Sequence, residues 1–191
     1  PFVGMQTGRF DMFCGPITPT PARSKQVSFS RPFFFIPYLA YARVGDHRYD
    51  RNVSLINDPK TKIAVIDGEF AYEIVNRDFP KASLLTLPPL SDGAQVMLSV
   101  TTKKADIFLN DSAAAAVFMD KNPNAVHVVS KSPLRTLPAV MVLPQNDLAF
   151  KTMVDTVLDQ LIADGYVDQV IQKYALKDSH FLRPALPYRG E

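Results

Sequence analysis

The chain has 191 residues, of which 47% are hydrophobic and 21% are charged, and its formal net charge is +2. This composition is typical of a globular protein with one large or two small domains. A net charge near zero, with Lys and Arg spread along the chain, gives no indication of a nucleic-acid partner. The apolar stretch Phe33 to Ala42 is interrupted by Pro37 and is too short to cross a bilayer.

The only cysteine, Cys14, excludes an intramolecular disulfide, which fits the cytoplasm or a Gram-negative periplasm. Cys14 lies in the apolar run Met12-Phe13-Cys14, so we expect a buried structural thiol rather than a nucleophile. The chain begins with Pro1 and no signal peptide precedes it, so we expect a chain that has been processed or cut.

The first 44 residues contain several prolines and only short elements. Pro16, Pro19 and Pro21 exclude a regular helix around them, whereas Thr20 can cap a short helix with Pro21 in its first turn. The expected elements are a helix end at Val3 to Thr7 capped by Gly8, a strand at Phe10 to Cys14, a short helix at 21–26 and a strand at Phe33 to Val44.

Strand and helix signals then alternate. The expected strands are Ile63 to Ile66, Ser83 to Leu87, Ala105 to Leu109 and Ala125 to Val129. The expected helices are one carrying Tyr72, Ile74 and Val75, one capped by Ser91-Asp92, and one over 113–121 capped by Asp111-Ser112. Such alternation predicts a mostly parallel sheet that is covered on both faces.

The last third contains the strongest helix signal. After a strand at Val140 to Leu143, Asp147 opens a helix that Asp164-Gly165 ends. A shorter amphipathic helix is expected from Val167 to Tyr174, followed by an irregular tail. The apolar face of the long helix contains Leu148, Phe150, Met153, Val154, Val157, Leu158, Leu161 and Ile162.

The run Gly15-Pro-Ile-Thr-Pro-Thr-Pro-Ala-Arg23 places two hydroxyls and one arginine at a strand-to-helix turn. A guanidinium is a planar fork of donors that fits a carboxylate, and a helix N-terminus adds unpaired N–H groups. This is the chemistry of a site for a small organic anion. The segment resembles the ligand-binding turn of family 3 bacterial extracellular solute-binding proteins, the polar amino-acid receptors of ABC importers.

The resemblance implies an α/β protein of the two-lobed, type II periplasmic-binding-protein fold, each lobe a mostly parallel sheet flanked by helices. Lobe 1 would contain residues 1–35 and 136–191, and lobe 2 would contain residues 36–135. The chain would cross between the lobes near Phe33–Pro37 and Leu134–Pro138, which would form a hinge. Family members begin with a strand and a helix that this chain lacks, so we expect lobe 1 to be incomplete at its N-terminus.

In lobe 1, Thr20-Pro-Ala-Arg23 matches the Thr-x-x-Arg turn whose arginine binds the ligand α-carboxylate in the family. Thr18 matches a threonine that hydrogen-bonds the ligand, and Gly15 and Pro16 match a stretch whose carbonyls face the ligand ammonium. Many relatives have a glycine or an aliphatic residue where this chain has Pro16 and Pro19. Proline stiffens the loop but keeps the carbonyl acceptor, so carboxylate binding should persist.

In lobe 2, Asp111 matches an aspartate at the head of a helix that pairs with the ligand α-ammonium, although simple helix capping would also explain it. Gly68 and Phe70 lie in a turn that matches one whose N–H groups bind the carboxylate. Glu69 replaces the usual hydroxyl there: pointing inward it would favour a cation, and pointing outward, the orientation we expect, it would only complement the helix dipole. Asp106 is expected to hold the entry of its strand.

The remaining candidate residues are assigned structural roles. The aromatic cluster of Phe13, Phe33, Phe34, Phe35 and Tyr38 is expected mainly to pack near the hinge, with some members able to line the cleft. His47, His127 and His180 show no metal-ligand spacing and no acidic partner nearby in sequence, so we assign no metal. Because phosphate-loop, dinucleotide and nucleophile-elbow motifs are absent from the sequence, we expect no cofactor.

The resemblance implies a monomeric, non-enzymatic periplasmic protein whose signal peptide has been removed. Its lobes would clamp a small zwitterion, such as an amino acid, and deliver it to the membrane permease of an ABC importer. Two alternatives remain open: an accessory or sensor domain of the same fold, and a cyclohexadienyl dehydratase-like enzyme in which Glu69 would supply the acid.

Overall fold

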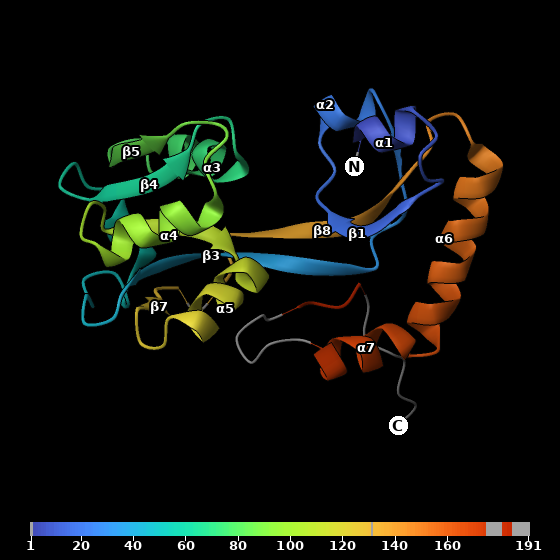
Figure 1. Cartoon of the computed structure of the whole chain (residues 1–191). Helices are drawn as coiled ribbons and strands as arrows, with labels where there is room; N and C mark the ends of the chain where they lie inside the picture. Colours follow the sequence, from blue (N-terminus) through green and yellow to red (C-terminus); the bar gives the residue numbers. More distant parts are fainter. Residues whose placement is uncertain (1, 131, 175–180, 185–191) are drawn as a thin grey trace. The chain divides into compact units, whose positions relative to one another are not determined.

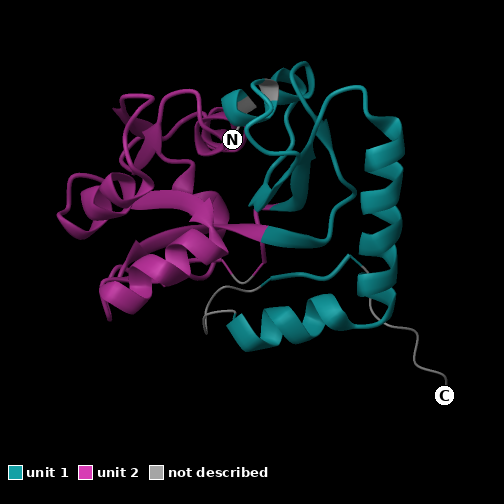
Figure 2. Ribbon diagram, turned by 45° about the vertical axis from the view of Figure 1, so that its right-hand side comes forward, with its two compact units in different colours: residues 1–36, 136–175, 180–191 teal, residues 37–135, 176–179 magenta. Residues whose placement is uncertain are grey.

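The computed structural model describes residues 2–130, 132–174 and 181–184. The chain divides into two compact units, shown in different colours in Figure 2. Unit 1 contains residues 1–36, 136–175 and 180–191, and unit 2 contains residues 37–135 and 176–179. The chain thus leaves unit 1 inside β3 (Phe34–Arg43) and returns at the start of β8 (Arg135–Leu143). Among the described helices, none is long and apolar enough to span a bilayer.

Unit 1 is a small antiparallel sheet with helices. Strand β8 lies between β1 and β2 and pairs antiparallel with both, so that Val142 faces Phe13 on one side and Phe29 on the other. The core is formed by Leu143, Val154 and Leu158. The elements are α1 (Phe2–Gln6), β1 (Phe13–Ile17), α2 (Pro21–Ser24), β2 (Ser28–Phe29), β8, α6 (Leu148–Ala163) and α7 (Tyr166–Tyr174) (Figure 1).

Unit 2 is a mixed sheet in the order β7-β3-β6-β4-β5. Strand β4 is parallel to both β5 and β6, whereas β3 is antiparallel to both β6 and β7. The elements are β3, a 3-10 helix η1 (Val53–Ile56), β4 (Lys62–Ile66), α3 (Phe70–Asp78), β5 (Ser83–Leu87), α4 (Gly93–Thr101), β6 (Ile107–Asp111), α5 (Ser112–Lys121) and β7 (Val126–Val128).

Both faces of the unit 2 sheet are buried, as the continuous apolar strand Ile63 to Ile66 requires. Successive side chains of a strand point to opposite faces. Ile63 and Val65 therefore pack with α3, whereas Ala64 packs with residues of α4 and α5. This three-layer arrangement confirms the α/β fold class that the sequence predicted.

Strand directions and one strand boundary differ from the sequence prediction. Unit 1 is not mostly parallel: its described strands pair antiparallel, because the βα repeats lie only in unit 2. Strand β1 begins at Phe13 rather than Phe10 and extends through Pro16 to Ile17. The prediction of a buried Cys14 was wrong, because strand alternation turns Phe13 inward and leaves Cys14 exposed.

Candidate functional site

The turn after β1 holds Thr18 and Arg23 together. The side-chain oxygen of Thr20 accepts a hydrogen bond from the Arg23 backbone N–H over 3.3 Å, and Pro21 occupies the first turn of α2. The Nη1 atom of Arg23 donates to the carbonyl oxygen of Thr18 over 2.8 Å. The Arg23 side chain, half-buried, is therefore oriented by its own turn. The predicted Thr20 cap holds in the structure.

Gly15 and Pro16 lie on β1, just before this turn. A Cβ atom on Gly15 would lie 2.6 Å from two ring carbons of Phe13, a separation that side chains do not tolerate. Position 15 therefore requires glycine as long as the Phe13 ring keeps its place. Pro16 is exposed, because it alternates with the half-buried Gly15 and Ile17.

In unit 2, the carboxyl ends of two parallel strands, β4 and β6, lie at the same edge of the sheet. Strand β4 ends at Ile66 and β6 ends at Asp111, and the helices α3 and α5 begin there. In α/β sheets, ligands bind outside the carboxyl ends of the strands. The turn into α3 contains Gly68 with a φ of 74°, a left-handed conformation that glycine adopts without strain.

Asp111 occupies this edge as the N-cap of α5. Its Oδ1 atom accepts a hydrogen bond from the Ala114 N–H over 2.8 Å. In the antiparallel pairing of β3 with β6, Asp111 faces Tyr38 directly. The capping role predicted for Asp111 is confirmed, and the side chain remains half-buried beside the tyrosine.

A pocket of about 240 Å³ lies at the same edge. Its polar side chains come from Tyr38, Glu69, Ser91 and Asn110. The Tyr38 ring packs edge-on against Phe70, with ring centres 5.6 Å apart and an angle of 83°. Burial raises the pKa of the Tyr38 phenol, and the negative charges of Asp111 and Glu69 raise it further. The edge thus combines a protonated phenol with two carboxylates.

The structure brings the unit 2 candidates together around this edge. Gly68, Glu69 and Phe70 form the turn into α3, and Phe70 and Asp111 are both neighbours of Tyr38. Glu69 is exposed, as expected, but it also lines the pocket rather than pointing only to bulk solvent. Tyr38 lines the pocket as well, whereas Phe33 packs on the unit 1 core.

Ser91 and Asn110 line the pocket, yet the sequence did not single them out for it. Asn110 directly precedes Asp111 at the end of β6, and Ser91 precedes the Asp92 cap of α4. A position at the carboxyl end of a parallel strand or at a helix N-terminus would have been the signal for both residues.

Asp106 has the structural role expected of it. Its Oδ2 atom accepts a hydrogen bond from the Lys62 N–H over 2.9 Å, and its Oδ1 atom accepts one from Arg48 over 2.6 Å. Asp46 pairs with the same arginine, so Asp46 and Asp106 hold it between them. These contacts fix the entry of β4 beside β6.

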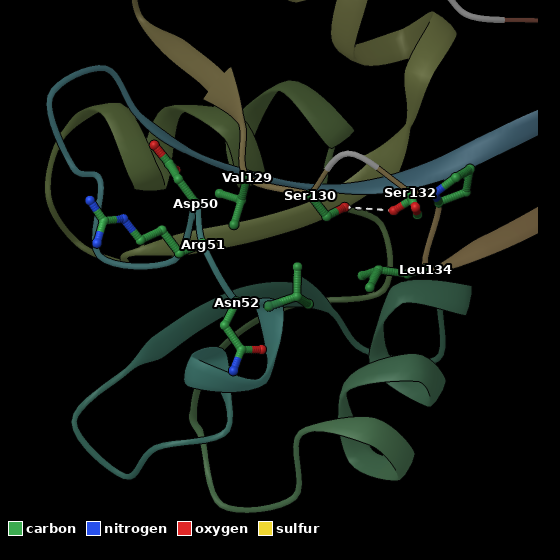
Figure 3. Close-up of a pocket in the computed structure, with 9 residues that line it drawn as sticks. Asp50, Arg51, Asn52, Val129, Ser130, Ser132 and Leu134 are labelled. Carbon is green, nitrogen blue, oxygen red and sulfur yellow. Dashed lines mark hydrogen bonds between the residues drawn. The ribbon is translucent and has the colours of Figure 1, made fainter.

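The expectation that His47 and His127 have no acidic partner was wrong. His47 Nδ1 lies 2.7 Å from Asp50 Oδ2, and His127 Nε2 lies 2.8 Å from Asp50 Oδ1. Asp50 follows His47 by three residues, but His127 joins them only because β7 pairs with β3. His180 lies outside the described residues. Asp50 also borders a second pocket of unit 2, of about 560 Å³, shown in Figure 3.

Comparison with known proteins gives one family match that covers most of the chain. Residues 2–177 match the sequence model of the bacterial extracellular solute-binding proteins, family 3. The amino-acid-binding protein AabA of Dichelobacter nodosus is 25% identical over 173 residues, which cover 89% of this chain and 66% of that protein. The chain therefore spans slightly less than two thirds of the length of this relative.

Solved structures agree with this match. The ancestral amino acid-binding protein AncCDT-1, a precursor of cyclohexadienyl dehydratase, is 26% identical with a TM-score of 0.72, over 91% of this chain and 72% of that one. An ancestral arginine-binding protein bound to arginine is 19% identical with a TM-score of 0.71, over 91% of this chain and 75% of that one. The similarity to the arginine-binding protein shows that the chain has the fold of the type II periplasmic binding proteins.

Proposed function

The chain belongs to family 3 of the bacterial extracellular solute-binding proteins, and from this premise we propose that it binds an amino acid with a cationic side chain for ABC import. The observation that carries the proposal is the unit 2 edge, where Glu69 and Asp111 lie close enough to Tyr38 for both carboxylates to raise its pKa. Two negative charges beside one pocket favour a ligand with two cationic groups. A cationic amino acid at neutral pH has an α-ammonium and a second cationic group, an ammonium in lysine or a guanidinium in arginine, at the end of its side chain.

Each ionic group of such a ligand has a partner in the proposal. Capping of α5 uses Oδ1 of Asp111, and its second oxygen would accept from the α-ammonium. Glu69 would pair with the side-chain cation. The α-carboxylate would bind the guanidinium of Arg23, which the hydrogen bond to the Thr18 carbonyl already orients. One ligand held by groups of both units would stabilise a closed state, which a membrane permease would recognise.

Two relatives support an amino-acid ligand, and one of them supports the cationic class. AabA is named an amino-acid-binding protein. AncCDT-1, at 26% identity, is also described as an ancestral cationic amino acid solute-binding protein. By family, the protein would act in the periplasm as a monomer, without enzymatic turnover.

The test is a titration of the full-length gene product with L-lysine, L-arginine, L-glutamine and L-glutamate by calorimetry. We expect saturable binding of lysine or arginine that exceeds binding of the other two. Arg23→Ala should weaken binding about tenfold or more, because a charge-assisted hydrogen bond contributes about 1.5–3 kcal/mol. Arg9→Ala is the matched control, since Arg9 is an exposed arginine of the same unit.

Glu69→Gln separates the ligand class from binding itself. The variant should lose its preference for lysine over glutamine while it still binds amino acids. Equal effects of Arg23→Ala and Arg9→Ala would overturn the carboxylate assignment. A wild-type preference for glutamate would overturn the cationic class.

The alternative is a dehydratase-like enzyme, which the position of Glu69 in the pocket favours. Elimination of this kind needs a carboxyl that stays protonated near neutral pH, and burial is what provides that. Glu69 is exposed, so we prefer the binding protein. Product formed from prephenate or arogenate would reverse this preference.

A further inference from the structure

The histidine–aspartate cluster of unit 2 lies apart from the candidate amino-acid site and has its own chemistry. It consists of His47 and Asp50, from the segment between β3 and η1, and His127, on β7. One ligand atom from each residue lies within 4.8 Å of the other two. We propose that these three side chains bind a divalent transition-metal ion, with Zn²⁺ as the best match to their two imidazole nitrogens and one carboxylate oxygen.

The orientation of His127 favours metal binding. Its Nδ1 atom lies 3.1 Å from the carbonyl oxygen of Arg43. A carbonyl only accepts, so Nδ1 carries the hydrogen and Nε2 presents its lone pair when the ring is neutral. Histidine ligands of metal ions are oriented in this way, with the second ring nitrogen donating to a backbone carbonyl or a carboxylate.

The Asp50 carboxylate contacts both imidazoles. One of its oxygens lies 2.7 Å from His47 Nδ1 and the other lies 2.8 Å from His127 Nε2. A carboxylate accepts only, so each of these contacts requires a hydrogen on the imidazole nitrogen. A single dication bound by the same nitrogens replaces both hydrogens and keeps the carboxylate neutralised.

The ligand atoms of the cluster lie close to the separations of a zinc site, and a small movement of His47 would complete the site. Zinc bonds to nitrogen and oxygen are about 2.0–2.2 Å long, so ligand atoms around a tetrahedral ion lie about 3.3 Å apart. His127 is held by the sheet, and its side chain is 24% exposed. The His47 side chain is 70% exposed and free of the core, so its rotation supplies the remaining closure.

The surrounding charges do not oppose a cation. Three arginines lie near the cluster. Arg43 and Arg48 both pair with Asp46 and Asp106. Arg51, which follows Asp50, is exposed, so solvent screens its charge. The pocket of about 560 Å³ that Asp50 borders shares no lining residue with the pocket at the unit 2 edge, and Figure 3 shows the Asp50 carboxylate turned away from Asn52.

A metal at this position would fasten the segment 44–52 to β7. His47 and Asp50 belong to that segment, whereas His127 pairs with Ala42 across the sheet. The same segment contributes Asp50, Arg51 and Asn52 to the pocket of about 560 Å³ shown in Figure 3. Metal binding would thus stabilise one wall of this pocket, whether or not an amino acid is bound.

The experiment is a calorimetric titration of untagged, chelator-treated full-length protein with ZnCl₂. We expect one Zn²⁺ per chain and a rise in melting temperature, because an ion that binds only the folded state stabilises it. His47→Gln and His127→Gln should each weaken binding by more than the roughly 10–100-fold that loss of an outer-shell partner costs. His180→Gln is the matched control, since it removes the third histidine of the chain.

Asp50→Asn provides a second variant that keeps the size of the side chain but removes its charge. Absence of saturable Zn²⁺ binding by the wild type overturns the proposal without any variant. Binding that survives both His47→Gln and His127→Gln, or that only His180→Gln removes, also overturns it. Circular dichroism of each variant shows whether a loss of binding reflects loss of fold.

Discussion

Asp111 allows the contributions of helix capping and ligand binding to be measured separately. Its Oδ1 atom caps α5 by accepting from the Ala114 N–H over 2.8 Å. Asn caps about as well as Asp, whereas Ala cannot cap. We therefore expect Asp111→Ala to lower the free energy of unfolding by about 1 kcal/mol. In a chain of this size, 1 kcal/mol corresponds to a change in melting temperature of about 2–4 °C.

Asp111→Asn should behave differently. It keeps the cap and loses only the interaction of a negative charge with the helix dipole, about 0.3–1 kcal/mol. If the second carboxylate oxygen binds the ligand ammonium, the variant also loses a charge-assisted hydrogen bond of about 1.5–3 kcal/mol. The dissociation constant for L-lysine or L-arginine should then rise about 10–150-fold. Binding would be affected far more than stability.

Asp147 provides the control for capping alone. It caps α6 in unit 1, where its Oδ1 accepts from the Phe150 N–H over 2.9 Å. Asp147→Ala should destabilise the protein about as much as Asp111→Ala and leave the affinity unchanged. Calorimetry and thermal melting of the variants supply both quantities. If Asp111→Asn binds as tightly as the wild type, Asp111 is only a cap and the ammonium assignment fails.

Two further predictions concern packing and protonation. Gly15→Ala should destabilise the protein by about 1 kcal/mol in urea unfolding, because the Phe13 ring must move away from a Cβ that would lie 2.6 Å from its outer carbons. Gly93→Ala, whose nearest neighbour is 4.0 Å away, should be neutral or stabilising, and equal losses would contradict the steric argument. Because the pKa of Tyr38 is raised, its phenol should ionise later than the ordinary pH of about 10 in an absorbance titration. The folded state holds the Tyr38 proton more tightly than the unfolded state does. The contribution of Tyr38 to the free energy of unfolding is therefore complete below about pH 10 and is lost progressively as the pH rises further. Tyr38→Phe should reduce this loss of stability at alkaline pH.

Signals from neighbouring residues in the sequence were sufficient to predict most helices and strands of unit 2. The aspartates before α4 and α5 cap their helices, and β5 has the predicted bounds, Ser83–Leu87. Each of these features depends on a few neighbouring residues: a capping oxygen, or a short apolar run between turns. The same holds in unit 1 for α6, which begins after Asp147 and ends at Asp164-Gly165.

Features that depend on pairing between distant strands could not be predicted from the sequence. Nothing local in the sequence specifies that Tyr38 faces Asp111, because that contact follows from the register of β3 against β6. The unit 1 sheet is a second case, since β1 and β2 both pair with β8, more than a hundred residues later in the chain. Pro138, inside β8, also obscured the first half of that strand, because proline is rare within sheets.

The His47–Asp50–His127 cluster combines both kinds of information. The His47–Asp50 contact spans three residues and was readable from the sequence, whereas the His127–Asp50 contact spans 77 and required the β3–β7 pairing. A rule based on the spacing of metal ligands in the sequence can detect the His47–Asp50 contact but not the His127–Asp50 contact.

The electrostatics of the unit 2 edge give a physical reason to connect its fold with binding. Asp111 is retained at the edge by its capping bond, but no such bond holds Glu69, which precedes α3 without a side-chain cap. Glu69 adds a second negative charge near the half-buried Tyr38, and this charge complements the dipole of α3 without a capping hydrogen bond. A cationic ligand would be attracted by both carboxylates, so the two charges would contribute to its affinity. An acid that forms no capping hydrogen bond and borders the pocket is therefore well placed to bind a ligand.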